Sequence, residues 1–164
     1  MKAVTFRQLR EAIKGGGRLL GMDIGVRNVG VAISDRGCRI ASPHSVLYRN
    51  QSTILSNIDK LGVLVQRHSV TGLVIGCPLE LAGHRSSQER MVKTFISELH
   101  NSGKFQELGY VYWDERLTTA AVSRTLQGLP IEGLQRKLIL DKMAAVSILQ
   151  ECLDNLWRLE QGDS

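Results

Sequence analysis

The chain has 164 residues, of which 43% are hydrophobic and 23% charged, a composition typical of one soluble globular domain. It contains no apolar run near the roughly 20 residues that a membrane-spanning helix needs, which excludes a protein with such spans. Its formal net charge of +5 favours an anionic partner such as nucleic acid, although a generic basic surface also fits this charge.

The cysteines and histidines show no pattern of a disulfide framework or a zinc site. Cys38, Cys77 and Cys152 are odd in number and far apart. The four histidines also lack ligand spacing. Unpaired cysteines fit a reducing compartment. We therefore expect a cytoplasmic protein, with an organelle as the alternative.

The first half of the chain predicts a leading helix and then three strands. Phe6, Leu9 and Ile13 lie on one helical face, and a Gly-rich linker at 15–17 ends it. We expect residues 1–17 to form this helix and linker, and residues 18–160 to form the domain. The segments 18–24, 28–34 and 38–48 read as strands joined by short turns, which indicates antiparallel hairpins.

The second half alternates helices with strands. A helix follows within 52–68, where Ile54, Ile58, Leu61 and Val65 have helical spacing. A strand at 72–78 comes next, and then a helix opened by Ser86 and Glu89. A fifth strand at 110–115 precedes a short helix, from Thr118 or Thr119 to Leu126, and a long helix at about 134–159. This order predicts an α/β fold with helices on both faces of a mixed sheet, in which three antiparallel strands are followed by two parallel ones.

Asp23 stands out because an acid within an apolar strand must be neutralised where it is buried. The two-residue period of a strand places it on the face of Leu19 and Gly21. Two interpretations are open here. A cation neutralises Asp23, or the carboxylate has a structural role, capping the turn at Gly25 or pairing with Arg27.

Two further acids end the fifth strand. Asp114 and Glu115 follow "YVYW", and the crevice beyond the carboxyl ends of parallel strands is the usual ligand site of an open sheet. The alternative is a solvated turn in which Glu115 pairs with Arg116.

Asp141 begins an otherwise apolar stripe of the last helix, which continues through Ala144, Ala145, Ile148 and Cys152. The alanines predict a close approach of this helix to the sheet, with Asp141 directed toward it. A favourable position near a helix end, or an ion pair with a neighbouring Lys or Arg, would also explain this acid.

These acids together suggest a metal site. Three or four convergent carboxylates repel one another unless divalent cations lie between them. Two hard cations at roughly 3.5–4 Å are the usual device for in-line displacement at phosphorus.

Four segments resemble, in order, the motifs of the RuvX/YqgF family of Holliday junction resolvase-like nucleases, within the ribonuclease H-like superfamily. They are "LLGMDIGVRNVGVAISD", "VIGCPLELAGHRS", "WDERLTT" and "LDKMAAVSILQECLD", and they span about residues 18 to 154. The resemblance implies a ribonuclease H-like, five-stranded mixed sheet. Its family is associated with Holliday junction DNA and with pre-16S rRNA maturation, so RNA and branched DNA are both expected substrates.

The resemblance also implies the site residues. The catalytic acids would be Asp23, Glu115 and Asp141. With Asp114 as a further ligand or a neighbouring group, they would hold Mg²⁺ or Mn²⁺, as two ions. Nucleic acid would contact four arginines, which are Arg27, Arg85, Arg116 and Arg136.

We therefore expect a divalent-metal-dependent endonuclease, a hydrolase acting as a monomer or homodimer. One alternative is a catalytically silent module of the same fold that binds nucleic acid or another partner, in which the arginines matter and the acids do not. A nucleotide-binding ATPase of the same superfamily is a further alternative, but such proteins pair two domains and this chain has room for one.

Overall fold

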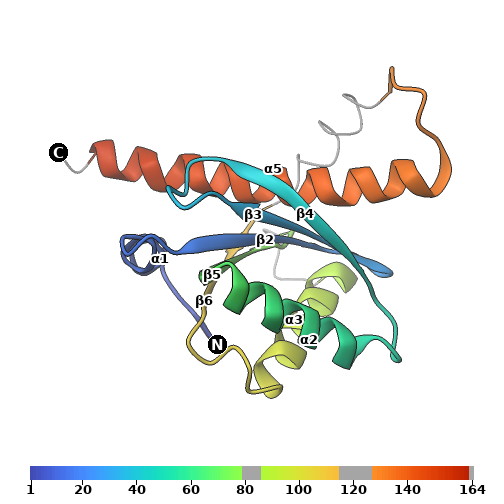
Figure 1. Cartoon of the computed structure of the whole chain (residues 1–164), viewed down its shortest axis with the longest axis horizontal. Helices are drawn as coiled ribbons and strands as arrows, with labels where there is room; N and C mark the ends of the chain where they lie inside the picture. The colour runs from blue at the N-terminus through green and yellow to red at the C-terminus, as the bar shows by residue number, and fades with distance from the viewer. Residues whose placement is uncertain (79–85, 115–126, 163–164) are drawn as a thin grey trace.

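One mixed sheet passes through the centre of the molecule (Figure 1). The computed structural model describes residues 1–78, 86–114 and 127–162. The strands follow the spatial order β1-β6-β5-β2-β3-β4. Their bounds are Lys2–Ala3 (β1), Arg18–Ile24 (β2), Asn28–Ser34 (β3), Ala41–Tyr48 (β4), Val70–Gly76 (β5) and Gly109–Trp113 (β6). The helices are Phe6–Ile13 (α1), Ile54–Arg67 (α2), Ser87–Asn101 (α3) and Gly133–Gly162 (α5).

The predicted strand directions are confirmed, but the predicted number of strands is wrong. β2, β3 and β4 are antiparallel neighbours, and β5 and β6 continue the sheet in parallel from β2. Among the described residues the sheet has six strands instead of five, because β1 pairs in parallel with the edge of β6. The backbone N–H of Lys2 donates to the Leu108 carbonyl at 3.2 Å, and that of Val4 donates to Tyr110 at 2.9 Å. A strand of two residues has no hydrophobic period, so the pattern does not reveal it.

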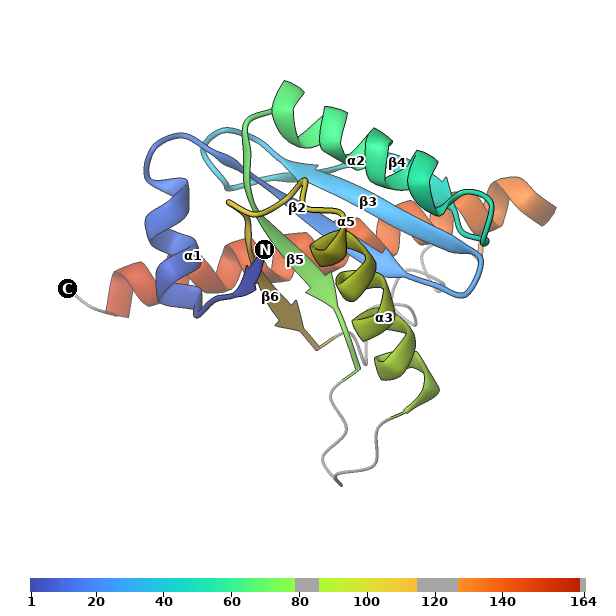
Figure 2. The same ribbon diagram turned by 90° about the horizontal axis from the view of Figure 1, so that it is seen from below.

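The helices cover both faces of the sheet, as predicted. α2 and α3 pack on one face, where their apolar side chains meet Leu20, Met22 and Ile24 of β2. α1 and α5 pack on the other face, around Leu19 of β2. Figure 2 shows α2 and α3 in front of the sheet and α5 passing behind it. Neighbouring residues of β2 therefore serve two separate hydrophobic clusters, as the two-residue period of a strand requires.

The ends of several elements have a clear local cause. Ser86 caps α3, because its Oγ accepts from the Glu89 backbone N–H at 3.1 Å, as the sequence predicts. β4 begins at Ala41 and not at Cys38, which lies in a turn with φ of 51° and whose thiol donates to the Gly17 carbonyl at 3.3 Å. The helix predicted from residue 118 or 119 to 126 lies outside the described residues.

The cysteines are all buried free thiols. Burial raises the pKa of Cys152 to about 12, so this side chain remains a neutral part of the core beneath α5. In the described ranges, none of the helices is both long and apolar enough to cross a membrane.

Candidate active site

Asp23 occupies the next-to-last position of β2, at the carboxyl edge of the parallel strands. Its side chain is half-buried, between the fully buried Met22 and Ile24. Leu19 belongs to the cluster beneath α5, and a side chain at Gly21 would meet α5 as well. The predicted face is therefore confirmed: Asp23 shares the side of the sheet that α5 covers.

Gly30 brings the backbone of α5 into direct contact with the sheet next to Asp23. In the β2–β3 ladder Asp23 is paired with Gly30. A Cβ at Gly30 would lie 2.1 Å from the carbonyl oxygen of Asp141, a distance that no real side chain tolerates. Gly21 has the same role further along α5, where a Cβ would lie 2.9 Å from the Ala145 carbonyl. Two glycines thus allow the close approach that the alanines of α5 predict.

The carboxylate of Asp141 is oriented by Asn28. The Asn28 side-chain amide donates to Asp141 Oδ2 at 3.0 Å. Asn28 is the first residue of β3, it is 6% exposed, and it shares a strand face with Gly30. Since β3 begins where the hairpin from β2 returns, this hydrogen bond holds Asp141 near the end of β2 that carries Asp23.

Sequence reasoning missed Asn28. The available signal was a polar residue that starts a strand of apolar residues, at an even spacing from Gly30 on the same face. Arg49 was missed too. Its guanidinium donates to the carbonyl of Gly25 at 3.2 Å and stabilises the turn between β2 and β3.

Asp114 lies at the same edge of the sheet. β5 separates β2 from β6, and the registers place Trp113 beside Gly76, and Met22 beside Ile75. Asp114 follows Trp113 directly, so it projects beyond the edge about one residue further than Asp23. Two inter-strand spacings, or roughly 10 Å, separate the two backbones. The backbones of Asp23 and Asp114 therefore lie at the same edge of the sheet, and the convergence of the acids in one metal site stays a prediction.

The end of β6 is also attached to α5. The Trp113 indole N–H donates to Glu151 Oε2 at 2.7 Å, and the ring packs edge-on against Phe6 of α1 at 5.8 Å between centroids. The strand that leads into Asp114 is therefore fixed to the helix that carries Asp141.

Two of the four predicted arginines, Arg27 and Arg136, lie within the described residues. Arg27 is exposed in the turn between β2 and β3, next to Asn28. Arg136 lies near the start of α5, and its guanidinium donates to the Ile131 carbonyl at 3.4 Å. Arg85, Glu115 and Arg116 lie outside the described residues.

The donor chemistry at this edge fits a hard divalent cation. Asp23, Asp114 and Asp141 offer carboxylate oxygens, which Mg²⁺ and Mn²⁺ prefer, and the Asn28 side-chain amide contacts Asp141. Within residues 1–78, 86–114 and 127–162, no three His, Cys, Asp or Glu side chains are close enough together to hold a metal. The predicted ligand set also includes Glu115, which those ranges omit.

Comparisons with known proteins identify the family. A family model described as "RuvX: Holliday junction resolvase" matches residues 17–155. The chain belongs to the RuvX family. The resemblance inferred from the four sequence motifs is thereby confirmed, and with it membership of a family of resolvase-like nucleases.

RuvX relatives from bacteria match nearly the whole chain. A protein of Paramagnetospirillum magneticum named "Putative pre-16S rRNA nuclease" is 38% identical over 138 residues, which cover 84% of this chain and 86% of that protein. A Zymomonas mobilis protein of the same name is 36% identical over 154 residues, 94% of this chain and 91% of that protein.

A solved structure supports the fold. RuvC of T. thermophilus, in a complex with a Holliday junction substrate, superposes with a TM-score of 0.55 over 85% of this chain and 96% of that chain. The sequence identity is 10%, so this likeness concerns the fold alone. It confirms an α/β architecture of the resolvase type for this RuvX protein.

Proposed function

We propose that this RuvX protein is a divalent-metal-dependent nuclease that hydrolyses phosphodiester bonds in structured nucleic acid. The observation that carries the proposal is the placement of Asp141 on α5 beside Asp23 on β2, through the contact at Gly30 and the hydrogen bond from Asn28. Two acids from distant parts of the sequence are held at one edge, as a site for hard cations requires. Membership of a nuclease family supports the same reading.

In this proposal each residue has a defined task. Asp23, Glu115 and Asp141 hold two Mg²⁺ or Mn²⁺ ions, with Asp114 as a further ligand or a neighbouring group. Such ions supply Lewis acidity for attack of water at phosphorus. Asn28 keeps the Asp141 carboxylate in one orientation. Arg27, exposed beside this edge, contacts a phosphate of the substrate, and Arg85, Arg116 and Arg136 are proposed to do the same.

A precursor of small-subunit ribosomal RNA is the first substrate to test. The relatives at 36–38% identity carry the name of a pre-16S rRNA nuclease. Branched DNA is the second, because the structurally similar RuvC was solved with a Holliday junction substrate.

The test is cleavage of a labelled pre-rRNA fragment, a single-stranded RNA and a four-way DNA junction, with Mg²⁺ or Mn²⁺ and with EDTA. We expect metal-dependent cutting by the wild type and a loss of about 100-fold or more in Asp23→Asn and Asp141→Asn, since each removes a charged ligand. Asp154→Asn is the matched control. Asp154 is an exposed acid of α5, like Asp141 a residue of that helix, and its carboxylate accepts a hydrogen bond from Gln150.

Cutting that persists in EDTA, or in both variants of the edge, would contradict the proposal. Absence of cutting on every substrate, combined with equal binding by the wild type and Asp141→Asn, would favour the catalytically silent module.

A further inference from the structure

A second surface of the molecule is suited to an anion. A groove of about 360 Å³ lies between α2 and the edge strand β4. Residues 44–47 of β4 form one wall, and Lys60, Val63 and Arg67 of α2, with the adjoining His68, form the other. We call this the α2–β4 groove. It lies on the face of the sheet opposite α5. β4 is the last strand in the order of the described sheet, after β3.

A β-bulge in β4 shapes one wall of the groove. Val31 pairs with Ser45 and Ala32 with Pro43, so His44 is the extra residue in β4. Its ring packs edge-on against His68, with 5.6 Å between centroids. Arg18 Nη1 lies 3.0 Å from His68 Nδ1. Because a guanidinium can only donate, His68 Nδ1 must be the acceptor.

The groove has cations but no acid. No Asp or Glu belongs to its lining, whereas Lys60 and Arg67 do. Among the described residues, neither of these cations forms an ion pair with a carboxylate. Unpaired cations above an apolar floor of Leu61 and Leu64 suit a ligand with negative charges on a less polar frame.

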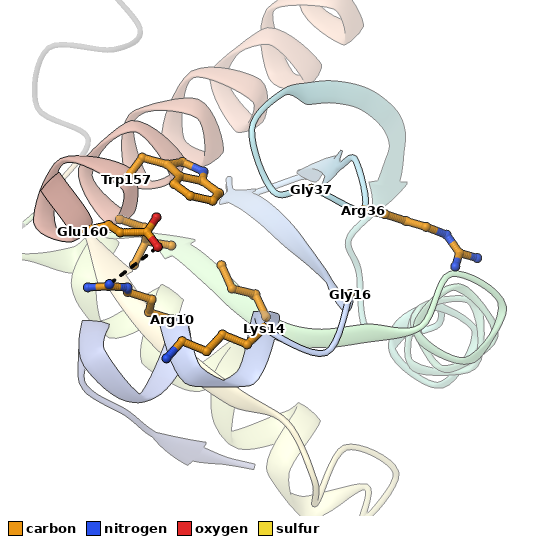
Figure 3. Close-up of a pocket in the computed structure, with 9 residues that line it drawn as sticks. Arg10, Lys14, Gly16, Arg36, Gly37, Trp157 and Glu160 are labelled. Carbon is orange, nitrogen blue, oxygen red and sulfur yellow. Dashed lines mark ion pairs between the residues drawn. The ribbon is translucent and has the colours of Figure 1, made fainter.

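A second pocket provides a contrast. It lies between α1, the β3–β4 turn and the end of α5, next to Trp157 (Figure 3). Its cations are already compensated, because Arg10 pairs with Glu160 at 3.8 Å and Lys14 with Glu11 at 2.6 Å. Figure 3 shows the remaining cation, Arg36, directed away from Trp157 and Glu160. Positive charge is therefore available in the α2–β4 groove and largely neutralised in this pocket.

One further cation, Lys142, lies between the groove and the candidate active site. Lys142 follows Asp141 on α5, which packs on β3 and β4. The pKa of His44 is lowered mainly by burial and by His68, and the positive charge of Lys142 lowers it further. Cations therefore lie on both sides of the β4 edge, from α5 to α2.

We propose that the α2–β4 groove binds the phosphodiester backbone of the nucleic acid outside the segment at the active edge. This proposal rests on the proposed function, because it assigns a second contact to the same substrate. Lys60 and Arg67 contact phosphates, and the exposed Val63 packs against a ribose. Binding of this kind is independent of base sequence.

The test is the salt dependence of binding, measured by fluorescence anisotropy in EDTA with an RNA duplex and a four-way DNA junction. Each phosphate contact contributes about 0.9 to the slope of log K against log salt concentration for duplex DNA. We therefore expect Lys60→Gln/Arg67→Gln to lower the slope by about 1.8 and to weaken binding several-fold at low salt. Arg10→Gln/Lys14→Gln removes the same charge from the other pocket and should leave the slope unchanged. Lys60→Arg/Arg67→Lys should retain the wild-type slope.

A slope in Lys60→Gln/Arg67→Gln equal to that of the wild type would overturn the groove proposal, as would equal reductions in both charge-removing variants. Because binding is measured without metal, this result is separate from cleavage. A reduced slope in Lys60→Gln/Arg67→Gln, with no cleavage by the wild type, would support nucleic-acid binding in the groove and contradict the proposed nuclease activity. Cleavage that depends on Asp141 with an unchanged slope would retain the nuclease and reject the groove.

Discussion

The two faces of the sheet use the same strands but meet their helices in different ways. Against α2 and α3, the strands present large side chains such as Leu20, Met22 and Ile24, which form a thick apolar layer. Against α5, the strands present Leu19 and Val74 but also Gly21 and Gly30, and the helix packs directly on these two glycines. Asp23 and Asp141 are on this second face.

This difference separates stability from positioning. A thick layer of aliphatic and aromatic side chains supplies burial and adjusts its packing when one side chain changes. A contact between two backbones has no side chain that can adjust, so it closely fixes the position of the helix on the strand. Such precision is what a metal-binding pair of carboxylates needs. The variants below test whether the α5 face has this role.

The largest effect is expected for Gly30→Ala. Its Cβ would lie 2.1 Å from the carbonyl oxygen of Asp141, so α5 must move away from β3. Overpacking of this kind costs about 3 kcal/mol, which for a chain of this size lowers Tm by roughly 6–12 °C. Thermal unfolding measures the change. Gly128→Ala is the matched control, since nothing lies within 4 Å of a Cβ there. A Gly30→Ala protein as stable as this control would show that the α5 contact is not rigid.

Two buried asparagines lie on opposite faces of the sheet. Asn28 donates to Asp141 on the α5 side, and Asn57 of α2 donates to the Tyr48 carbonyl at 2.5 Å. Each is replaced by Ala, and each loss of a buried hydrogen bond should cost about 1–3 kcal/mol in the free energy of unfolding.

Only Asn28→Ala should change the response to metal. Loss of a residue that orients a ligand weakens metal affinity by roughly 10–100-fold. The readouts are the Mg²⁺ concentration for half-maximal cleavage and the rise of Tm on adding Mg²⁺ without substrate. Equal metal responses in Asn28→Ala and Asn57→Ala would contradict an orienting role for Asn28.

The fold could be predicted largely from the sequence, because strand periods and helix faces are local patterns. The strands at 18–24 and 28–34 follow from short apolar runs between turns, and the face of Asp23 follows from the two-residue period of a strand. The contact between Asn28 and Asp141 joins residues 113 positions apart, so no local pattern contains it. β1 was missed for a related reason, since two residues become a strand only through their partner β6. The roles of Asp23, Glu115 and Asp141 remain predictions.

A smaller effect is expected at the start of α1, the short helix on the α5 face. Thr5 and Gln8 form a reciprocal cap, in which the Gln8 backbone N–H donates to Thr5 Oγ1 at 3.1 Å and the Thr5 N–H donates to Gln8 Oε1 at 2.9 Å. Thr5→Ala should cost about 1 kcal/mol, and Thr5→Ser, which keeps the hydroxyl, should cost less. Urea unfolding measures both variants.

The same experiment tests whether α1 folds together with the sheet. Leu9 is 1% exposed within the cluster beneath α5. We therefore expect Thr5→Ala to shift one cooperative transition, seen equally by tryptophan fluorescence and by far-ultraviolet circular dichroism. A fluorescence transition that stays at the wild-type midpoint would instead assign residues 1–17 to a separately folding segment.

The smallest effect concerns pH at the β4 edge, where the two faces meet. Burial lowers the pKa of His44 from its usual 6.5, and the neighbouring His68 and Lys142 lower it further. The unfolded chain therefore binds a proton at this residue before the folded protein does. The contribution of neutral His44 to the free energy of unfolding is fully present above about pH 6.5. It is lost as the pH falls toward the pKa of His44 in the folded state. His44→Gln cannot titrate, so its urea midpoint should fall less than that of the wild type between about pH 8 and pH 5.5. Parallel curves for the two proteins would mean that His44 is as easily protonated in the folded state as in the unfolded chain, and that its packing against His68 is looser than the structure shows.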